Sequence, residues 1–238
     1  MRLQVRGFRP GLWLLAGLLS AAASNAGTKN ERREEGVYKI LVAGREIGSE
    51  KYALSIGEES ATSTSVLDFR NPAGPPQRLH FETRLEMDRQ FRPRTYRLNT
   101  EVDGTKGFMV GTFSPHEAMF EYGGTRAPQK SGLLVGEDYT LLDTNIFHHF
   151  IFLGRRFDFD SGEKTQRFEV VVPQESESGA LKISDLGPET LVVGGKKQEA
   201  HHLKVDSGAK LIELWVDRER RLQKIAVPAI KLEVLRNP

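Results

Sequence analysis

The chain of 238 residues contains no cysteine, only two tryptophans and only four methionines. The absence of cysteine excludes a disulfide framework, a thiolate metal site and a cysteine nucleophile. It also excludes a lipoprotein, whose lipid is attached to a cysteine. An exported chain of this size without disulfides must be held together by its core and its hydrogen bonds. This fits a periplasm at least as well as an animal extracellular space.

The chain also has little excess charge of either sign. It contains 34 Lys and Arg against 32 Asp and Glu, which gives a net charge of +2. Arg2, Arg6 and Arg9 lie in the first 26 residues, where no acidic residue occurs, so removal of that segment changes +2 to −1. A partner such as nucleic acid or an anionic membrane surface needs a basic face that survives maturation. We therefore expect no nucleic-acid partner.

Long apolar runs are confined to the N-terminal end. Basic residues precede the run from Leu12 to Leu19, and small residues follow it in "SAAASNAG". This is the three-part form of a secretory signal, and the run is too short for a permanent membrane helix. We predict a signal peptide over residues 1–26, cleavage after Ala26, and no stable membrane span in the mature chain. An uncleaved anchor is the alternative, and the predicted location is periplasmic or secreted.

Alternation of apolar and polar residues dominates the rest of the chain. In "RLHFETRLEMD", residues 78–88, apolar or small side chains take every second place and charged ones take the others. This period of two predicts a strand with one solvated face. Similar segments are separated by turn sequences such as Asp103-Gly104 and Ser207-Gly208, which favour hairpins. The order of segments predicts an antiparallel meander in a single mainly β domain, residues 36–238, after a flexible lead-in over 27–35.

One segment, "DTNIFHHFIFLGRRF", has a helical pattern instead. Its start can be capped by Asp143 or Thr144. Its apolar residues recur at helical spacing at Ile146, Phe150 and Leu153. A sheet with one apolar face must curl or find a cover. We therefore predict a curved half-open barrel whose concave face is covered by one helix over about 143–154.

Two pairs of adjacent histidines are the strongest candidates for a metal site. His148 and His149 fall in the predicted helix, where neighbours diverge by about 100° around the axis. His201 and His202 fall in a predicted strand, where neighbours face opposite sides. Neither pair can bind one ion by itself, and the residues are interpreted as boundary histidines with an apolar body and a solvated tip. A composite site with one histidine from each pair is left open. No metal ligand, cofactor or catalytic residue is predicted.

Two stretches have a familiar pattern of strands and turns: "VYKILVAGREIGSEKYAL", and "EAHHLKVDSGAKLIELWVDRERRLQKIAVP" near the end of the chain. The pattern is similar to exported β-domains of unknown function related in architecture to the LolA/LolB lipoprotein carriers. The resemblance implies a half-open antiparallel barrel wrapped over a helical cover, and it brings no functional residue with it. The carriers use more than one helix as a lid, and LolB is anchored through a cysteine that this chain lacks.

The predicted function is that of a binding module. The concave apolar side of a half-barrel is a natural pocket for a hydrophobic, lipid-like ligand, with the helix as its lid. The candidate ligand-binding residues are Phe147, Phe150, Ile151, Leu153 and Trp215. The alternative is a non-enzymatic structural or protein-interaction domain in envelope assembly, with a barrel filled by its own side chains and an envelope protein as partner. We do not expect an enzyme.

Overall fold

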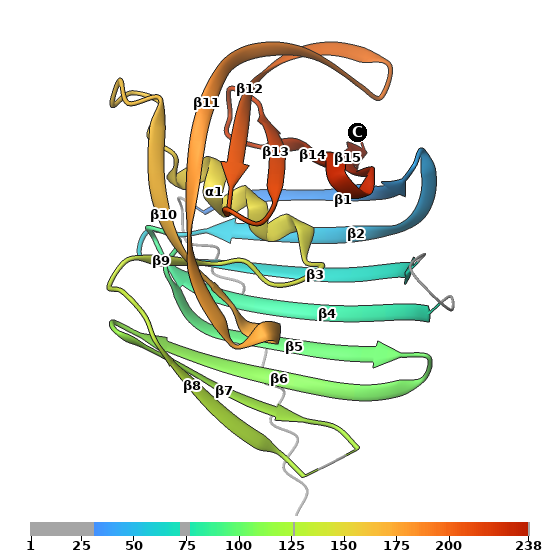
Figure 1. Ribbon diagram of the computed structural model, residues 1–238, viewed down its shortest axis with the longest axis vertical. Coiled ribbons are helices and arrows are strands. Elements are labelled where there is room, and N and C mark those ends of the chain that lie inside the picture. The colour runs from blue at the N-terminus through green and yellow to red at the C-terminus, as the bar shows by residue number, and fades with distance from the viewer. Residues whose placement is uncertain (1–30, 72–76, 126, 238) are drawn as a thin grey trace, which may run out of the picture.

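Fifteen strands form one sheet, and a short helix packs against it (Figure 1). The computed structural model describes residues 31–71, 77–125 and 127–237. The predicted signal peptide over residues 1–26 lies outside the described residues. Within them, no helix has the length and apolar character needed to cross a bilayer.

The first half of the chain is an antiparallel meander, as the alternation predicts. Its strands are β1 (Arg32–Val42), β2 (Arg45–Ile56), β3 (Ser60–Asn71), β4 (Gln77–Asp88), β5 (Pro93–Val102), β6 (Thr105–Ser114), β7 (Glu117–Gly123) and β8 (Gln129–Leu134). The turn Asp103-Gly104 has φ of 49° and 84°, the positive values that two-residue hairpin turns require. The predicted lead-in over 27–35 was too long, because Arg32 to Glu35 already pair with the end of β2.

The second half adds β9 (Tyr139–Leu141), the 3-10 turn η1 (Phe147–His149), the helix α1 (Phe150–Arg156), β10 (Thr165–Val172), η2 (Pro173–Glu175), β11 (Glu177–Val193), β12 (Lys196–Asp206), β13 (Leu211–Val216), β14 (Leu222–Val227), η3 (Pro228–Ile230) and β15 (Leu232–Asn237). β15 pairs with β1, so the two halves join into one sheet. The strand order runs from β8 down to β1, then from β15 down to β9.

One pair of strands departs from the antiparallel pattern. β9 and β10 are parallel neighbours, with Val170 opposite Thr140. The segment that connects them contains η1 and α1. Parallel neighbours need a long crossover connection, usually a helix, whereas antiparallel neighbours need only a tight turn. The parallel pair therefore follows from the helix that interrupts the meander.

The sheet curls without closing. β8 and β9 stand at opposite ends of the strand order. Side chains join the two ends: the Tyr122 hydroxyl donates to the carbonyl of Pro173 at 2.8 Å, and the Tyr139 hydroxyl donates to that of Ser114 at 3.0 Å. The predicted half-open barrel is confirmed, and its opening is bridged by side chains.

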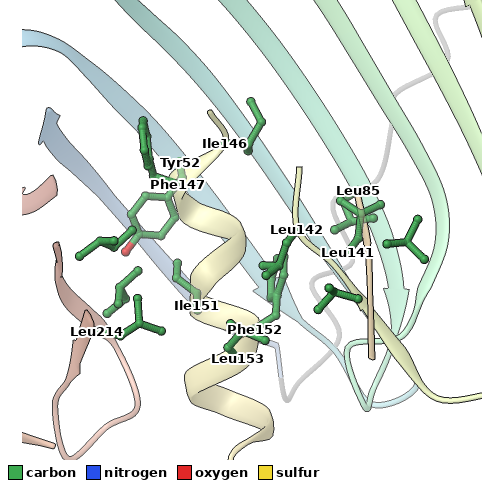
Figure 2. Close-up of a cluster of buried hydrophobic side chains, with 14 of the residues drawn as sticks. Tyr52, Leu85, Leu141, Leu142, Ile146, Phe147, Ile151, Phe152, Leu153 and Leu214 are labelled. Atoms are coloured by element: carbon green, nitrogen blue, oxygen red, sulfur yellow. The ribbon is translucent and has the colours of Figure 1, made fainter. Parts of the chain in front are cut away.

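The helix lies on the concave side of the sheet (Figures 1 and 2). The helical segment, η1 followed directly by α1, begins later than predicted, at Phe147, and ends at Arg156. Asn145 has a φ of 64° and Ile146 is extended, so residues 143–146 cannot be helical. Gly154 approaches the side chain of Val216 on β13. The helix is thus held between the first strands of the meander and the returning C-terminal strands.

Candidate functional site

Four of the five predicted ligand-binding residues lie on η1 and α1. Phe147, Ile151 and Leu153 expose 7%, 1% and 0% of their surface, and Phe150 is half-buried. They belong to or pack against the main core, together with inward side chains from both halves of the sheet. Figure 2 shows Ile151, Phe152 and Leu153 among core side chains from the sheet. The apolar concave face is therefore covered by the helix.

The fifth residue, Trp215, does not join them. Its neighbours Leu214 and Val216 belong to the main core, so alternation turns Trp215 to the other face of β13. The indole N–H donates to Glu189 at 2.9 Å, and the ring stacks on His202 with centroids 4.4 Å apart. It forms a second, smaller cluster with Leu191, Ala200 and Ala226. The prediction that Trp215 shares a site with the helix was wrong.

One carboxylate on the sheet holds the start of the helix. Glu50 on β2 is 0% exposed, and its Oε2 accepts hydrogen bonds from the backbone N–H groups of Phe147 at 3.0 Å and His148 at 2.9 Å. Its Oε1 lies 2.6 Å from Nδ1 of His148, which must carry the hydrogen because a carboxylate only accepts. The first N–H groups of a helical segment have no partner within it. Glu50 therefore caps the helix from a strand.

The same histidine contacts a hydroxyl. Nε2 of His148 lies 3.3 Å from Oγ of Ser63 on β3, so a carboxylate, an imidazole and a serine stand in the order used by serine hydrolases. All three side chains are buried. His148, however, belongs to the helix, whereas Glu50 and Ser63 belong to the sheet. Any helix movement that exposed Ser63 would also take the imidazole away from it, so we interpret the group as a structural lock.

A second carboxylate holds the end of the helix. Glu34 on β1 accepts a hydrogen bond from Arg155 of α1, and the two side chains are each 6% exposed. Glu34 also accepts from the Tyr52 hydroxyl at 2.9 Å and from Arg236 at 3.1 Å. Both ends of the helix are therefore tied to acceptors on the inner face of the sheet.

The segment that leads into the helix contains two further buried titratable groups. The Asp143 carboxylate accepts from the Tyr96 hydroxyl and from the backbone N–H of Gln174, both at 2.9 Å. Burial raises the pKa of Asp143 to about 6, although these hydrogen bonds oppose the rise. The backbone N–H of Asp143 donates to Nδ1 of His149, and burial, followed by the charge of His148, lowers the pKa of His149 well below its usual value.

Two donors on the helix segment have no hydrogen-bond partner among the described residues. They are Nε2 of His149, which carries the hydrogen because Nδ1 accepts one, and Nε of Arg155. Both atoms are buried. A buried donor without an acceptor costs about 1–3 kcal/mol. In this position the helical segment therefore leaves two buried donors without hydrogen bonds to described residues.

The histidine pairs do not form a composite site. His148 and His149 are each 0% exposed, so the predicted solvated tip was wrong for both, because the helix covers the sheet instead of lying at its margin. His201 packs on Phe159 with centroids 4.6 Å apart, while His202 stacks on the indole of the outer cluster. Within the described ranges, no group of three or more potential ligands could hold a metal ion.

Two surface hollows lie away from the helix, and many of their lining residues are polar or charged. One lies beside β4, β5 and β6, and its lining includes His80, Glu82, Asn99, Glu101 and Phe108. Another is lined mainly by charged residues near Arg156, Asp158 and Glu169. The first is open to solvent and combines polar side chains with apolar surface, and the second is mainly polar, whereas a hydrophobic ligand is usually buried in an enclosed, mainly apolar pocket. The apolar candidate site is therefore the concave face beneath the helix.

Glu34 and Glu50 were missed by the sequence reasoning, although both interrupt the alternation. Glu50, Tyr52 and Leu54 occupy successive inward positions of β2, and all three are buried. Glu34 stands in the same way ahead of Tyr38 on β1. A charged residue at an apolar position of a strand is the signal that could have found them, because an unpaired buried charge is costly.

This architecture is that of a β-barrel-like domain. A solved structure with a similar fold is a β-barrel-like protein of the domain of unknown function DUF1849 from Brucella abortus, with a TM-score of 0.53 and 10% identity over 85% of this chain and 94% of that chain. At this identity the likeness shows the fold alone. No family model and no curated protein matches the chain. The resemblance to the LolA/LolB carriers stays a prediction.

Proposed function

We propose that the protein binds a hydrophobic, lipid-like ligand on the concave face of its half-barrel, in the periplasm or cell envelope, with η1 and α1 as a movable lid. One observation carries this proposal. The apolar concave face is covered by a segment of ten residues, 147–156, that lies outside the sheet and is tied to it by buried carboxylates at both ends. A cover of this kind can move without breaking a strand ladder.

The free energy that is lost when the apolar side chains of the lid are exposed is similar to the free energy that is gained when a ligand chain is buried in their place. Exposing the four buried apolar side chains of the lid, at about 1.5–3 kcal/mol each, costs roughly 6–12 kcal/mol. They are Phe147, Ile151, Phe152 and Leu153. A chain of about twelve methylenes recovers roughly 10 kcal/mol at about 0.8 kcal/mol each. The two unpartnered donors of the lid reduce the cost further. A long acyl or alkyl chain can therefore replace the lid, whereas a short one cannot.

The edges of the sheet support the same conclusion. The two ends of the sheet are joined through side chains, such as Tyr122 of β7, which bonds Pro173 of η2, and Tyr139 of β9, which bonds Ser114 of β6. A net side-chain hydrogen bond contributes about 1 kcal/mol to stability. Widening the opening therefore costs far less than separating two paired strands, and the half-barrel can accommodate a displaced helix.

Two measurements test the proposal. Native mass spectrometry of the purified protein is expected to detect a bound ligand of acyl-chain mass, and the protein is expected to bind the hydrophobic dye N-phenyl-1-naphthylamine. The absence of cysteine allows a third readout. An Ile151→Cys variant should react with maleimide at least about tenfold faster when dodecanol is bound, as expected for a residue exposed by local opening.

The control for labelling is Val66→Cys, at a position 41% exposed on β3. Its rate should be the same with and without dodecanol. A protein that carries no ligand, ignores the dye and shows an unchanged rate at position 151 would overturn the proposal.

One observation favours the alternative, an interaction domain. Leu134, at the end of the terminal strand β8, is 87% exposed, and Met119 and Phe108 on the same outer face are 39% and 37% exposed. An open sheet edge can accept a strand from an envelope protein. Leu134→Lys should then shrink the native complex that contains the protein in envelope extracts. Val192→Lys, at a position 65% exposed on β11, is the control. Equal complex sizes for the wild type and both variants would exclude this surface.

A further inference from the structure

The contacts between lid and sheet specify the kind of head group that the ligand carries. We infer that the ligand is a single-chain amphiphile with a cationic, hydrogen-bond-donating head group, and that Glu50 binds this head. The inference rests on the proposed function, because it assumes that the ligand takes the place of the lid.

The contacts of the lid with the two buried carboxylates of the sheet, Glu50 and Glu34, run in one direction. At Glu50 the donors are two backbone N–H groups of η1 and the imidazole of His148. At Glu34 the lid donor is the guanidinium of Arg155. In both places the lid supplies the donor or cation and the sheet supplies the carboxylate. The groups by which the closed lid contacts Glu50 and Glu34 therefore indicate that these carboxylates bind cations or hydrogen-bond donors.

Displacing the lid affects the two carboxylates differently. Glu34 keeps two sheet partners, Tyr52 and Arg236. The three hydrogen bonds that the Glu50 carboxylate makes to described residues all come from the lid, so the carboxylate loses them together. A carboxylate left on an apolar face without partners is strongly unfavourable. Glu50 is therefore the position at which the ligand must supply a replacement.

The surroundings of Glu50 favour a charged donor beside an apolar chain. Its cross-strand neighbour on β3 is Leu67, and the next inward residue of β2 is Tyr52; both are buried. Arg236, whose guanidinium lies over the Tyr52 ring, is already paired with Glu34. An ammonium group can donate three hydrogen bonds, the number that Glu50 accepts from the lid. A carboxylate head would bring a second negative charge to the same place.

The test compares three amphiphiles that share a twelve-carbon chain: dodecylammonium, dodecanol and dodecanoate. Each competes with N-phenyl-1-naphthylamine for the wild-type protein near neutral pH. Dodecylammonium is expected to bind about tenfold or more tightly than dodecanol, because a charge-assisted hydrogen bond to Glu50 is gained. Dodecanoate is expected to bind more weakly than dodecanol.

Glu50→Gln is the matched variant, because it keeps the shape of the side chain and removes its charge. Loss of the charge also weakens the hold on the lid and raises all three affinities together, so the readout is their ratio. The preference for dodecylammonium over dodecanol should fall to near one. Glu34→Gln should retain most of the preference, since Glu34 keeps its sheet partners.

The outcomes separate the two proposals. Binding of dodecanoate as tightly as dodecylammonium would show that the head-group inference is wrong while ligand binding stands. An unchanged preference in Glu50→Gln would show that the ammonium is bound elsewhere, which also overturns the inference. Failure of all three amphiphiles to bind would overturn both proposals. The comparison of the three amphiphiles on the wild-type protein keeps the head-group inference testable even if the variant fails to fold.

Discussion

Val216 on β13 lies directly against Gly154 of α1: a Cβ atom at position 154 would be 2.9 Å from Cγ2 of Val216. Alanine favours a helix over glycine by about 1 kcal/mol. Overpacking of a core costs typically 1–3 kcal/mol. We therefore expect Gly154→Ala to lower the free energy of unfolding by about 1 kcal/mol, as measured by urea denaturation.

The control for this prediction is the double variant Gly154→Ala with Val216→Ala. The smaller side chain removes the close contact, so the cost of the alanine at position 154 should disappear or change sign when measured against Val216→Ala alone. A cost that is the same in both backgrounds would show that Val216 is not the cause.

Glu50 should determine how often the lid opens. Removal of one partner from a buried charged group typically costs several kcal/mol. If about 2 kcal/mol of this falls on lid opening, the amide hydrogens of residues 150–156 in Glu50→Gln should exchange about thirtyfold faster than in the wild type. The amides of β4 should change much less, because the hydrogen bonds of the Glu50 carboxylate to described residues all go to Phe147 and His148. Equal acceleration in both segments would contradict a local role.

Ser63→Ala is the matched control for that exchange experiment. It removes only the 3.3 Å contact to His148 and leaves the Glu50 hydrogen bonds in place. A single neutral hydrogen bond contributes about 1 kcal/mol. We expect a clearly smaller acceleration than in Glu50→Gln. The opposite ranking would mean that the serine, not the carboxylate, holds the lid.

Asp143 should make stability depend on pH. Because its pKa is raised from 3.8 to about 6, the folded state binds more protons than the unfolded state between these values. The free energy of unfolding contributed by this group therefore falls as pH rises through the range, by about 3 kcal/mol in total. His149 acts in the opposite direction, because its lowered pKa reduces stability as pH falls below 6.5.

Asp143→Asn separates the two effects, since the amide keeps an acceptor oxygen and cannot titrate. Urea denaturation of the wild type and the variant should be measured from below pH 4 to pH 7, the range set by the ordinary and raised values. The variant should gain stability relative to the wild type as pH rises. A stability difference that stays constant across the range would contradict the raised pKa.

Trp215 should matter for stability and not for ligand binding. Trp215→Phe removes the hydrogen bond to Glu189, which contributes about 1 kcal/mol, and keeps an aromatic ring in the outer cluster. We expect a modest loss of stability by circular dichroism and unchanged binding of N-phenyl-1-naphthylamine. Phe152→Ala, in the lid core, should cost about 3–5 kcal/mol and alter dye binding. Loss of dye binding in Trp215→Phe would show that Trp215 belongs to the binding site.

Much of the secondary structure could be predicted from local patterns. The alternation over residues 78–88 corresponds to β4, and Asp103-Gly104 forms the turn between β5 and β6. The helix was predicted from "DTNIFHHFIFLGRRF", but its start was placed too early. Asp143 is of a residue type that commonly caps helices, yet its carboxylate accepts hydrogen bonds from Tyr96 and Gln174 instead. Those partners come from distant strands and turns, which local patterns do not describe.

The sequence by itself determined most of the strands and turns and the existence of one helix, because the direction of each side chain along a strand or helix follows from the local backbone. Only the tertiary structure decided where the helix is held. Glu50 and His148 are 98 positions apart in the chain, and they meet because the curl of the sheet brings β2 beneath the helix. Alternation along the strands places the carboxylates on one face of the sheet and Trp215 on the other, and the curl makes the face with the carboxylates the concave one, which determines what that face can bind.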